Sequence, residues 1–291
     1  MKSLLLIFSL LLGIVFPQAH IYSFLINYLL MTILFFTFLD IKPRVFYWNT
    51  ILIVFTNVGI AVAFYLLLLP LHSDLALVCF MTAIMPSATA SPAMARFLKQ
   101  NVEYVTVSVI LTNSIISLSI PFLIAGLIHP KNNVSTPTIL ISVSTLIFAP
   151  LLLAQITKFL YPSINYYGPI FKNLSFYIWN FLIFIASASA THFIVNQSKA
   201  TPQMLAAIAA CSLLICILNF WVGRLIGGKQ FAREASQSLG HKNTMFSVWI
   251  SLSFLNPIAA IGPMFYVLYQ NLYNCYQLAH AQEHSSMNDP G

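Results

Sequence analysis

The sequence predicts an all-α integral membrane protein, and three observations point to this fold class. Hydrophobic residues make up 59% of the 291 residues and charged residues only 7%, and the mean hydropathy is +0.86. A soluble domain cannot cover its surface with so few charges, so most of the chain is expected to lie in lipid. The apolar runs are long and continuous rather than short and alternating, which indicates helices rather than the strands of a barrel.

The apolar runs predict ten membrane-spanning helices joined by short connections, so that residues 1–291 form a single transmembrane domain. The expected spans are residues 3–17, 21–39, 45–69, 75–98, 102–128, 137–160, 173–195, 202–223, 235–255 and 258–280. In the first nineteen residues Lys2 precedes an apolar run, as in a signal peptide, but the possible cleavage site after residues 17–19 is poor. We therefore interpret them as the first span.

The basic residues support the order of these spans, because they gather on alternate connections. With the amino terminus inside, ten of the thirteen Lys and Arg residues lie on the cytoplasmic side: Lys2, Lys42, Arg44, Arg96, Lys99, Lys158, Lys172, Arg224, Lys229 and Arg233. The outer connections carry only Lys131 and Lys199. This is the positive-inside distribution. It predicts a protein of the cell inner membrane with both termini in the cytoplasm, and it accounts for the net charge of +7 without a nucleic-acid partner.

The thirteenth basic residue, Lys242, belongs to neither side. It lies nine residues after Arg233, and nine residues rise about 13 Å along a helix, which is too deep for the side chain to reach the surface easily. An unpaired lysine at such a depth costs about 3 kcal/mol, and lysines placed there usually face a cavity or a transport pathway. A hydrogen bond to unwound carbonyl groups is the structural alternative.

Two of the expected spans are interrupted at their middle. In the fourth span, Pro86 and Pro92 frame Ser87, Thr89 and Ser91, and each proline removes a backbone donor and disfavours helix at the residue before it. In the ninth span the stretch GHKNT, residues 240–244, interrupts helical propensity, and its Asn or Thr suits the N-cap of the apolar half that follows.

Each half of the chain therefore contains one broken helix, in the fourth of five spans. Matching breaks of this kind are typical of secondary transporters built from inverted repeats, whose binding site lies where the breaks meet. The repeats are expected at residues 1–130 and 137–281. Helix N-termini that point at the middle of the membrane would offer N–H groups to an anion.

At these residues the chain resembles the bile acid:sodium symporter family over nearly its whole length. The motifs that carry the resemblance are FLDIKP (38–43), PSATASPAMARFLKQNVEYV (86–105), LGHKNT (239–244) and GPMFYVLYQNLYN (262–274). The resemblance implies a panel of spans one, two, six and seven, and a core of spans three to five and eight to ten with the broken helices crossed. The implied activity is uptake of small organic anions such as bile acids, sulfated steroids or pantothenate-like acids, usually driven by sodium.

Residue by residue, the resemblance implies a substrate site and an altered ion site. The substrate residues are Ser87, Thr89, Ser91, His241, Asn243, Thr244 and Asn271. Ser238 and Lys242 stand where the family has an acidic residue and a glutamine that help to hold sodium. Because a hard cation needs several oxygen ligands, we expect transport without sodium, with the ammonium of Lys242 in the place of the ion or with proton coupling. Direct binding of the substrate anion by Lys242 remains the alternative.

Functions of other classes were compared with this expectation. No GxSxG, HExxH or cluster of acidic residues is present, so we do not expect an enzyme, a metal centre or a cofactor. A sodium-coupled symporter of organic anions is the first alternative function. An anion channel and a membrane ligand sensor without transport are the others, since broken helices also line pores.

Overall fold

The computed structural model describes residues 2–40, 47–128, 136–196 and 201–287, and every regular element in these ranges is a helix. Five of the described helices are long and apolar enough to cross a membrane: Asn49–Leu68, Val102–Leu127, Pro137–Leu160, Asn173–Phe193 and Pro202–Gly240. Shorter apolar helices lie among them, at Leu25–Leu39, Ser73–Ala83 and Thr244–Phe254. The chain is therefore an all-α, multi-pass membrane protein, as its composition predicts.

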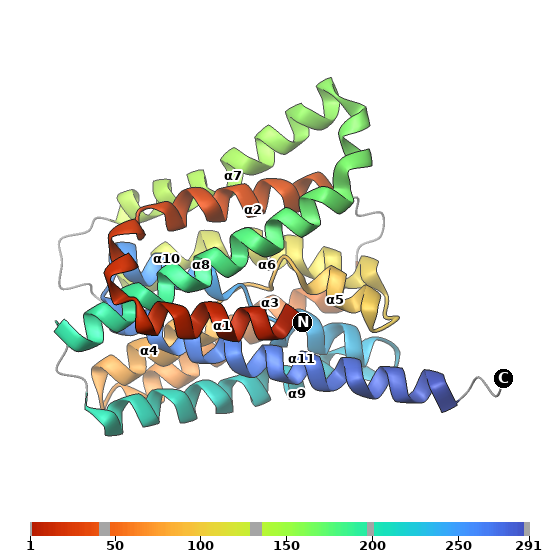
Figure 1. Ribbon diagram of the computed structural model, residues 1–291. Coiled ribbons are helices and arrows are strands. Elements are labelled where there is room, and N and C mark those ends of the chain that lie inside the picture. Colours follow the sequence, from red (N-terminus) through yellow and green to blue (C-terminus); the bar gives the residue numbers. More distant parts are fainter. Residues whose placement is uncertain (1, 41–46, 129–135, 197–200, 288–291) are drawn as a thin grey trace.

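The helices follow the expected spans closely (Figure 1). The first half contains α1 (Lys2–Val15), η1 (Pro17–Tyr22), α2 (Leu25–Asp40), α3 (Asn49–Leu68), α4 (Ser73–Ala83), α5 (Ser91–Phe97), α6 (Val102–Leu123) and the π-helical turn η2 (Ile124–Ile128). The second half contains α7 (Thr136–Leu160), η3 (Pro162–Tyr167), α8 (Gly168–Asn196), α9 (Pro202–Gly240), α10 (Thr244–Phe254), η4 (Pro257–Ala260) and α11 (Ile261–Met287). The fourth and ninth expected spans are each divided into two helices.

Polar caps explain where several of these helices begin. The Asn101 side chain accepts from the backbone N–H of Tyr104 at 3.0 Å, and that of Thr201 accepts from Met204 at 3.2 Å. Such caps satisfy donors that the first turn of a helix leaves without partners.

Helix α9 (Pro202–Gly240) reverses direction at Gly228. Gly228 has φ +58, which lies outside the helical region, and the chain folds back there. A Cβ on Gly223 would lie 2.6 Å from the Ala235 carbonyl oxygen, and the Ser236 hydroxyl donates to the Phe220 carbonyl at 2.7 Å. The segments before and after the bend therefore pack side by side. They correspond to the expected spans 202–223 and 235–255, with the second beginning a few residues earlier than predicted.

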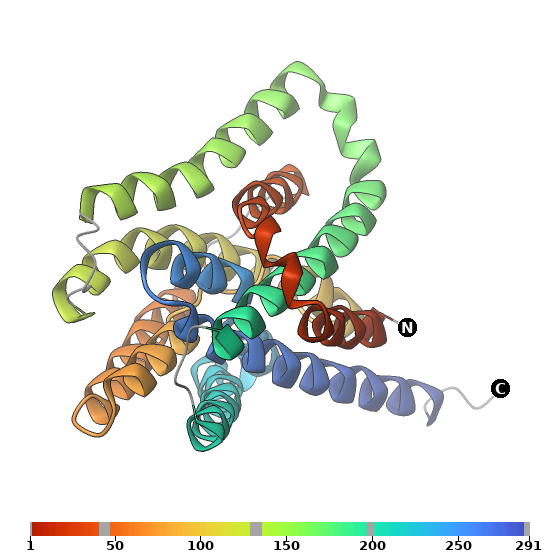
Figure 2. The ribbon, with the colours of Figure 1, turned by 60° about the vertical axis from the view of Figure 1, so that its left-hand side comes forward.

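The helices pack as two groups. One group consists of α1, α2, α7 and α8, in which α8 contacts α1 and α2, and α2 contacts α7; Figure 2 shows α7 and α8 arching around α2. The other group consists of α3 to α6 and α9 to α11. Within the first group α1 lies close to α8: a Cβ on Gly13 would come within 2.6 Å of Ser187 Cβ, and the Ser187 hydroxyl donates to the Leu10 carbonyl at 2.7 Å. Small residues allow this close approach of two helices in lipid.

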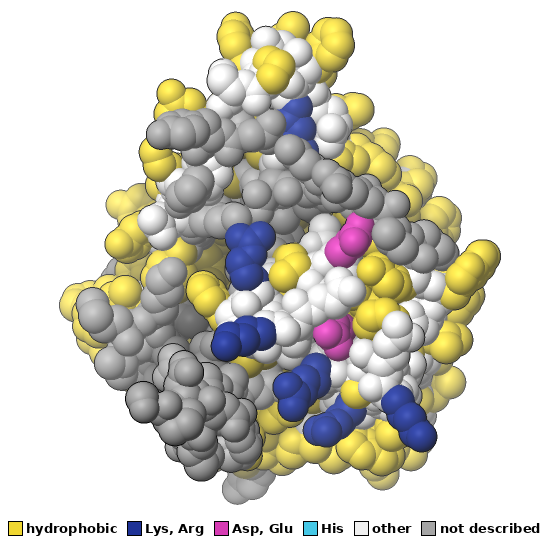
Figure 3. Space-filling view, turned by 90° about the vertical axis from the view of Figure 1, so that its right-hand side faces the viewer, with side chains coloured by type: hydrophobic (Ala, Val, Ile, Leu, Met, Phe, Trp, Pro, Cys, Tyr) yellow, Lys and Arg dark blue, Asp and Glu magenta, His cyan; other side chains and the backbone are white. Residues whose placement is uncertain are grey.

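Basic side chains gather on one end of the molecule (Figure 3). The exposed basic residues of the described chain include Arg96, Lys99, Arg224, Lys229 and Arg233, which come from the end of α5 and from the reversal in α9. The same region is tied together by the Glu234 carboxylate, which accepts from the backbone N–H of Asn101 at 2.9 Å. All five belong to the connections that the sequence assigns to the cytoplasm.

For six of the basic residues, the predicted side of the membrane cannot be compared with the position of the side chain in the structure. Lys42, Arg44, Lys131 and Lys199 lie outside the described residues, as do residues 41–43 of the FLDIKP motif. Lys2 and Lys172 lie in described helices, but their side chains are not among the described ones.

Candidate functional site

The break in the fourth span is an open segment between α4 and α5, residues 84–90. Its backbone is satisfied by side chains of neighbouring helices. The Asn57 amide of α3 donates to the carbonyls of Ile84 at 3.1 Å and Met85 at 2.9 Å. From α6, Thr112 Oγ1 accepts from Ser87 N at 3.2 Å, and the Asn113 amide donates to the Ser87 carbonyl at 2.9 Å. Four backbone groups of this non-helical segment are therefore bonded to side chains of α3 and α6.

The break in the ninth span is shorter, at residues 241–243. Asn243 is the N-cap of α10, where its side chain accepts from the backbone N–H of Phe246 at 3.4 Å, so the predicted cap is confirmed. Two side chains of α11 hold the backbone before it. The Tyr266 hydroxyl donates to the Gly240 carbonyl at 2.7 Å. The Gln270 amide accepts from Lys242 N at 2.8 Å and donates to the Lys242 carbonyl at 3.3 Å.

The two breaks pair with each other through an isolated antiparallel bridge between Ser87 and Lys242. Ala88 N donates to the His241 carbonyl at 2.7 Å, and Asn243 N donates to the Pro86 carbonyl at 2.8 Å. We call these two open segments, residues 84–90 and 241–243, the junction. Segments about 155 residues apart in the chain thus satisfy each other's backbone groups, as irregular backbone at membrane depth must.

Lys242 is buried at the junction, with 2% of its surface exposed. Its ammonium donates to the Asn57 side-chain oxygen, and Asn57 in turn holds the Ile84 and Met85 carbonyls. The ammonium is thus linked to the broken end of α4 through one neutral amide. A buried cation is tolerated only where such oxygen atoms replace water.

His241 is also buried, with 4% of its surface exposed. Among the described residues, neither ring nitrogen of His241 has a hydrogen-bond partner. Buried polar atoms nearly always have partners. The imidazole is therefore a buried polar group at the junction whose hydrogen bonds are satisfied by none of the described residues.

Most of the residues that the sequence singles out meet at this junction. Ser87, Ser91, Ser238, His241, Lys242 and Thr244 are buried there, and Asn243 is half-buried. The Ser87 hydroxyl donates to the Ser238 carbonyl, whereas the Ser238 hydroxyl donates within its own helix to the Glu234 carbonyl at 2.8 Å. Thr89 is half-buried in the first open segment.

Asn271 is not brought into the hydrogen-bonded junction. Its amide donates to the Val267 carbonyl one turn earlier in α11 at 2.7 Å. The neighbouring residue, Gln270, binds Lys242 instead. Successive residues of a helix point about 100° apart, so Gln270 and Asn271 face different directions. Which of the two amides faces the junction depends on how α11 is rotated about its axis, and the sequence YQN does not predict that rotation.

The supporting side chains Asn57, Thr112, Asn113, Tyr266 and Gln270 were missed in the sequence, and Asn57 and Gln270 are the two of them that bond to Lys242. Each is a neutral amide within an apolar run, in TNVG and in LYQN respectively. Amides in membrane helices usually bond across helices. That signal was available for Asn57, although the sequence does not reveal which helix it would face.

The chain matches no protein-family model, and no curated protein matches it either.

Proposed function

We propose that this protein is a secondary transporter of small organic anions that works by alternating access without sodium. The observation that carries the proposal is the junction, where two broken helices meet around the buried side chain of Lys242. Paired helix breaks at membrane depth are the common architecture of binding sites in secondary transporters. The motifs that resemble the bile acid:sodium symporter family lie at the same residues, and membership of that family is part of the proposal.

The packing of the helices supports a transporter with two moving parts. In the proposed topology the chain crosses the inner membrane ten times as two inverted repeats, 1–130 and 137–281, with both termini in the cytoplasm. The group of α1, α2, α7 and α8 then corresponds to the panel, and the other group to the core that carries the junction. Rocking of one rigid group against the other gives access to the site from each side in turn.

The junction has groups suited to an anion. Helix α10 begins at the junction, and the N–H groups and positive dipole end of its first turn attract negative charge. Beside it lies the His241 imidazole, whose ring nitrogens have no partner within the described part of the chain. In the proposal the anionic group binds among His241, Asn243 and Thr244, with the hydroxyls of Ser87, Thr89 and Ser91 nearby.

The side chains at the junction support independence from sodium. A sodium ion needs about six oxygen ligands, preferably with a carboxylate among them. Here Lys242 places an ammonium at the junction, where it binds the oxygen of Asn57, and the Ser238 hydroxyl is turned to its own helix. The fixed cation then stabilises the junction as a bound ion would, and no ion has to leave during the cycle.

A thermal-stability screen of the purified protein tests this function. A bile acid, a sulfated steroid and pantothenate are added in sodium chloride and, in parallel, in choline chloride. We expect at least one anion to raise the melting temperature saturably and equally in both salts, because a ligand that binds only the folded state stabilises it.

Panthenol, the alcohol that lacks the carboxylate of pantothenate, is the matched control ligand and is expected to have no effect. Stabilisation that appears only in sodium would contradict the independence from sodium. If no anion stabilises the protein, the anion-transport proposal itself is contradicted.

A further inference from the structure

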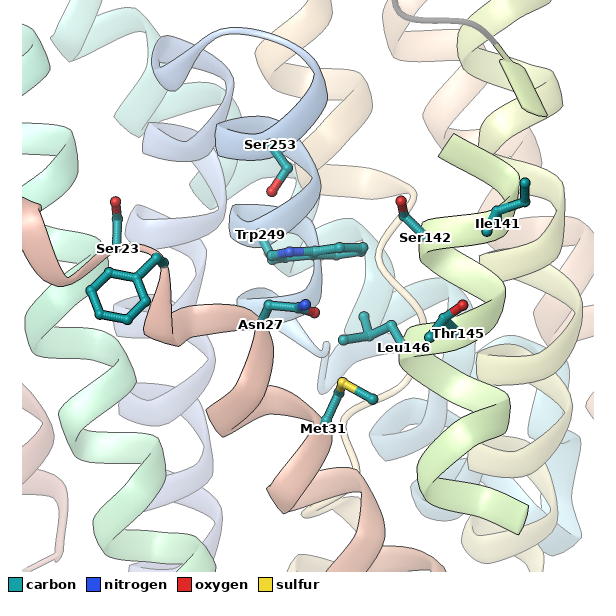
Figure 4. A pocket seen from close by; sticks show the side chains of 10 residues that line it. Ser23, Asn27, Met31, Ile141, Ser142, Thr145, Leu146, Trp249 and Ser253 are labelled. Atoms are coloured by element: carbon teal, nitrogen blue, oxygen red, sulfur yellow. The ribbon is translucent and has the colours of Figure 1, made fainter. Parts of the chain in front are cut away.

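A cavity of about 410 Å³ lies between α2, α7 and α10. Figure 4 shows Asn27, Trp249 and Ser253 among the residues that line it. The Trp249 side chain is only 6% exposed and the Asn27 side-chain oxygen is buried, so neither group is open to a ligand. The charged groups that are open to a partner lie on the surface of the molecule instead.

Five basic side chains are exposed together at one end of the molecule (Figure 3). We call them the basic cluster: Arg96, Lys99, Arg224, Lys229 and Arg233. None of the five forms an ion pair with a carboxylate of the described residues. The cluster therefore keeps its positive charge available to an anionic partner.

Two segments of the chain supply the basic cluster, and the fold holds them together. Arg96 belongs to α5, which contacts α9. The backbone N–H of Asn101 donates to the Glu234 carboxylate at 2.9 Å. This bond brings Lys99, two residues before Asn101, close to Arg233, the neighbour of Glu234. The two other basic residues lie at the reversal of α9, so all five belong to one region of the surface.

Exposed apolar side chains lie beside these cations. On α9, Trp221 comes one turn before Arg224 and Leu225 directly follows it, and both apolar side chains are 59% exposed. On α5, Phe97 directly follows Arg96 and is 64% exposed. A tryptophan at the end of a membrane-spanning helix usually lies at the level of the lipid headgroups. The cations are therefore placed at the headgroups, with apolar surface next to them for acyl chains.

We propose that the basic cluster binds an anionic phospholipid. The phosphate lies between Arg224 and the neighbouring cations, and the acyl chains lie along Trp221 and Leu225. Guanidinium groups bind phosphate oxygens through paired hydrogen bonds, and basic groups beside membrane helices are a common binding pattern for anionic lipids. A soluble anion would meet the charges alone, whereas a lipid also covers the apolar side chains.

The bound lipid would connect two helices that lead to the junction. Helix α5 begins at Ser91 and α9 ends at Gly240, and both residues are buried at the helix breaks. A lipid that bridges the other end of α5 and the reversal of α9 therefore holds these two helices together. This proposal does not depend on the transport of anions.

The test measures lipid binding to the purified full chain by native mass spectrometry in a neutral detergent. Dioleoylphosphatidylglycerol is the probe, and dioleoylphosphatidylcholine, which has the same acyl chains but no net charge, is the control lipid. We expect saturable binding of the anionic lipid and about tenfold weaker binding of the neutral one. Arg224→Gln should weaken binding of the anionic lipid about fivefold, because one cation near the headgroups is lost.

Lys158→Gln is the matched control variant, because it removes the same charge from α7 in the other packed group. The Lys158 ammonium donates to the Phe38 carbonyl at 2.7 Å, and glutamine keeps a donor at this position. The affinity for the anionic lipid should stay unchanged. Equal weakening by Lys158→Gln and Arg224→Gln would show attraction by net charge alone and would overturn the proposal.

The comparison of the two lipids on the unmodified protein needs no variant, so the test survives a failure of any variant to fold. Equal affinity for the two lipids would show attachment through the acyl chains alone and would overturn the proposal. Glycerol 3-phosphate at the same concentration should not displace the anionic lipid. Displacement would show a site for soluble phosphates, and the assignment to a lipid would be wrong.

Discussion

Replacement of Asn57 by leucine is expected to destabilise the folded protein by about 3–5 kcal/mol, because Lys242 Nζ and two buried carbonyls lose this partner and each such loss costs about 1–3 kcal/mol. The Asn57 oxygen receives the Lys242 ammonium, and its amide holds the carbonyls of Ile84 and Met85. Leucine fills a similar volume but offers no oxygen. The measurement is the free energy of unfolding, or the melting temperature, of the purified protein in detergent.

The control is the double variant Asn57→Leu/Lys242→Met, which separates the effect of the unpaired charge from the effect of changed packing at position 57. In Asn57→Leu alone, the ammonium of Lys242 has lost the oxygen to which it donates. The added change Lys242→Met removes that ammonium, so the double variant should be more stable than Asn57→Leu alone. The coupling between the two positions should reach about 1–3 kcal/mol, as for groups in one hydrogen-bond network. Additive effects would contradict the role of Asn57 as the partner of the ammonium.

The second large effect is expected at Gln270. Gln270→Leu removes the side chain that bonds both the N–H and the carbonyl of Lys242. The Lys242 carbonyl still accepts from Thr244 N at 3.0 Å after this change, so the Lys242 N–H is the group left without its partner. A buried backbone group without a partner costs about 1–3 kcal/mol, and the helix break cannot recruit water at membrane depth. We therefore expect a loss of about 1–3 kcal/mol in the free energy of unfolding.

Asn271→Leu is the matched control for this change, because it removes a neighbouring amide of the same helix. Among the described residues, Asn271 bonds the Val267 carbonyl of its own α11 alone, and the helix does not require this bond. Its replacement should change the free energy of unfolding by less than about 1 kcal/mol. If Asn271→Leu proves as costly as Gln270→Leu, the rotation of α11 described above is wrong.

The helical fold and the two breaks could be predicted from sequence because both have strong local causes. Long apolar runs leave only helices as spanning structures. Pro86 and Pro92 forbid a regular helix between them, and the polar stretch at 240–244 ends one helix and caps the next. The meeting of the two breaks was expected from their matching positions in the two halves.

The partners of the breaks could not be predicted, because they depend on packing between helices. The sequence shows amides at Asn57, Asn113, Gln270 and Asn271 alike, and nothing local tells which of them faces the junction. The cavity beside Trp249 was missed for the same reason. Its walls come from three helices separated by more than a hundred residues, and a serine, an asparagine and a tryptophan form no motif in a sequence.

The most direct test of the proposed role of Lys242 is the melting temperature of the ligand-free Lys242→Gln variant in sodium chloride and in choline chloride. If the ammonium stands in for an ion, the variant melts below the unmodified protein in choline, because the junction has lost its fixed positive charge. Sodium should then restore part of the loss in this variant alone, since glutamine supplies an oxygen ligand. An unchanged melting temperature in choline, together with weakened anion binding, would contradict this account and assign Lys242 to the substrate.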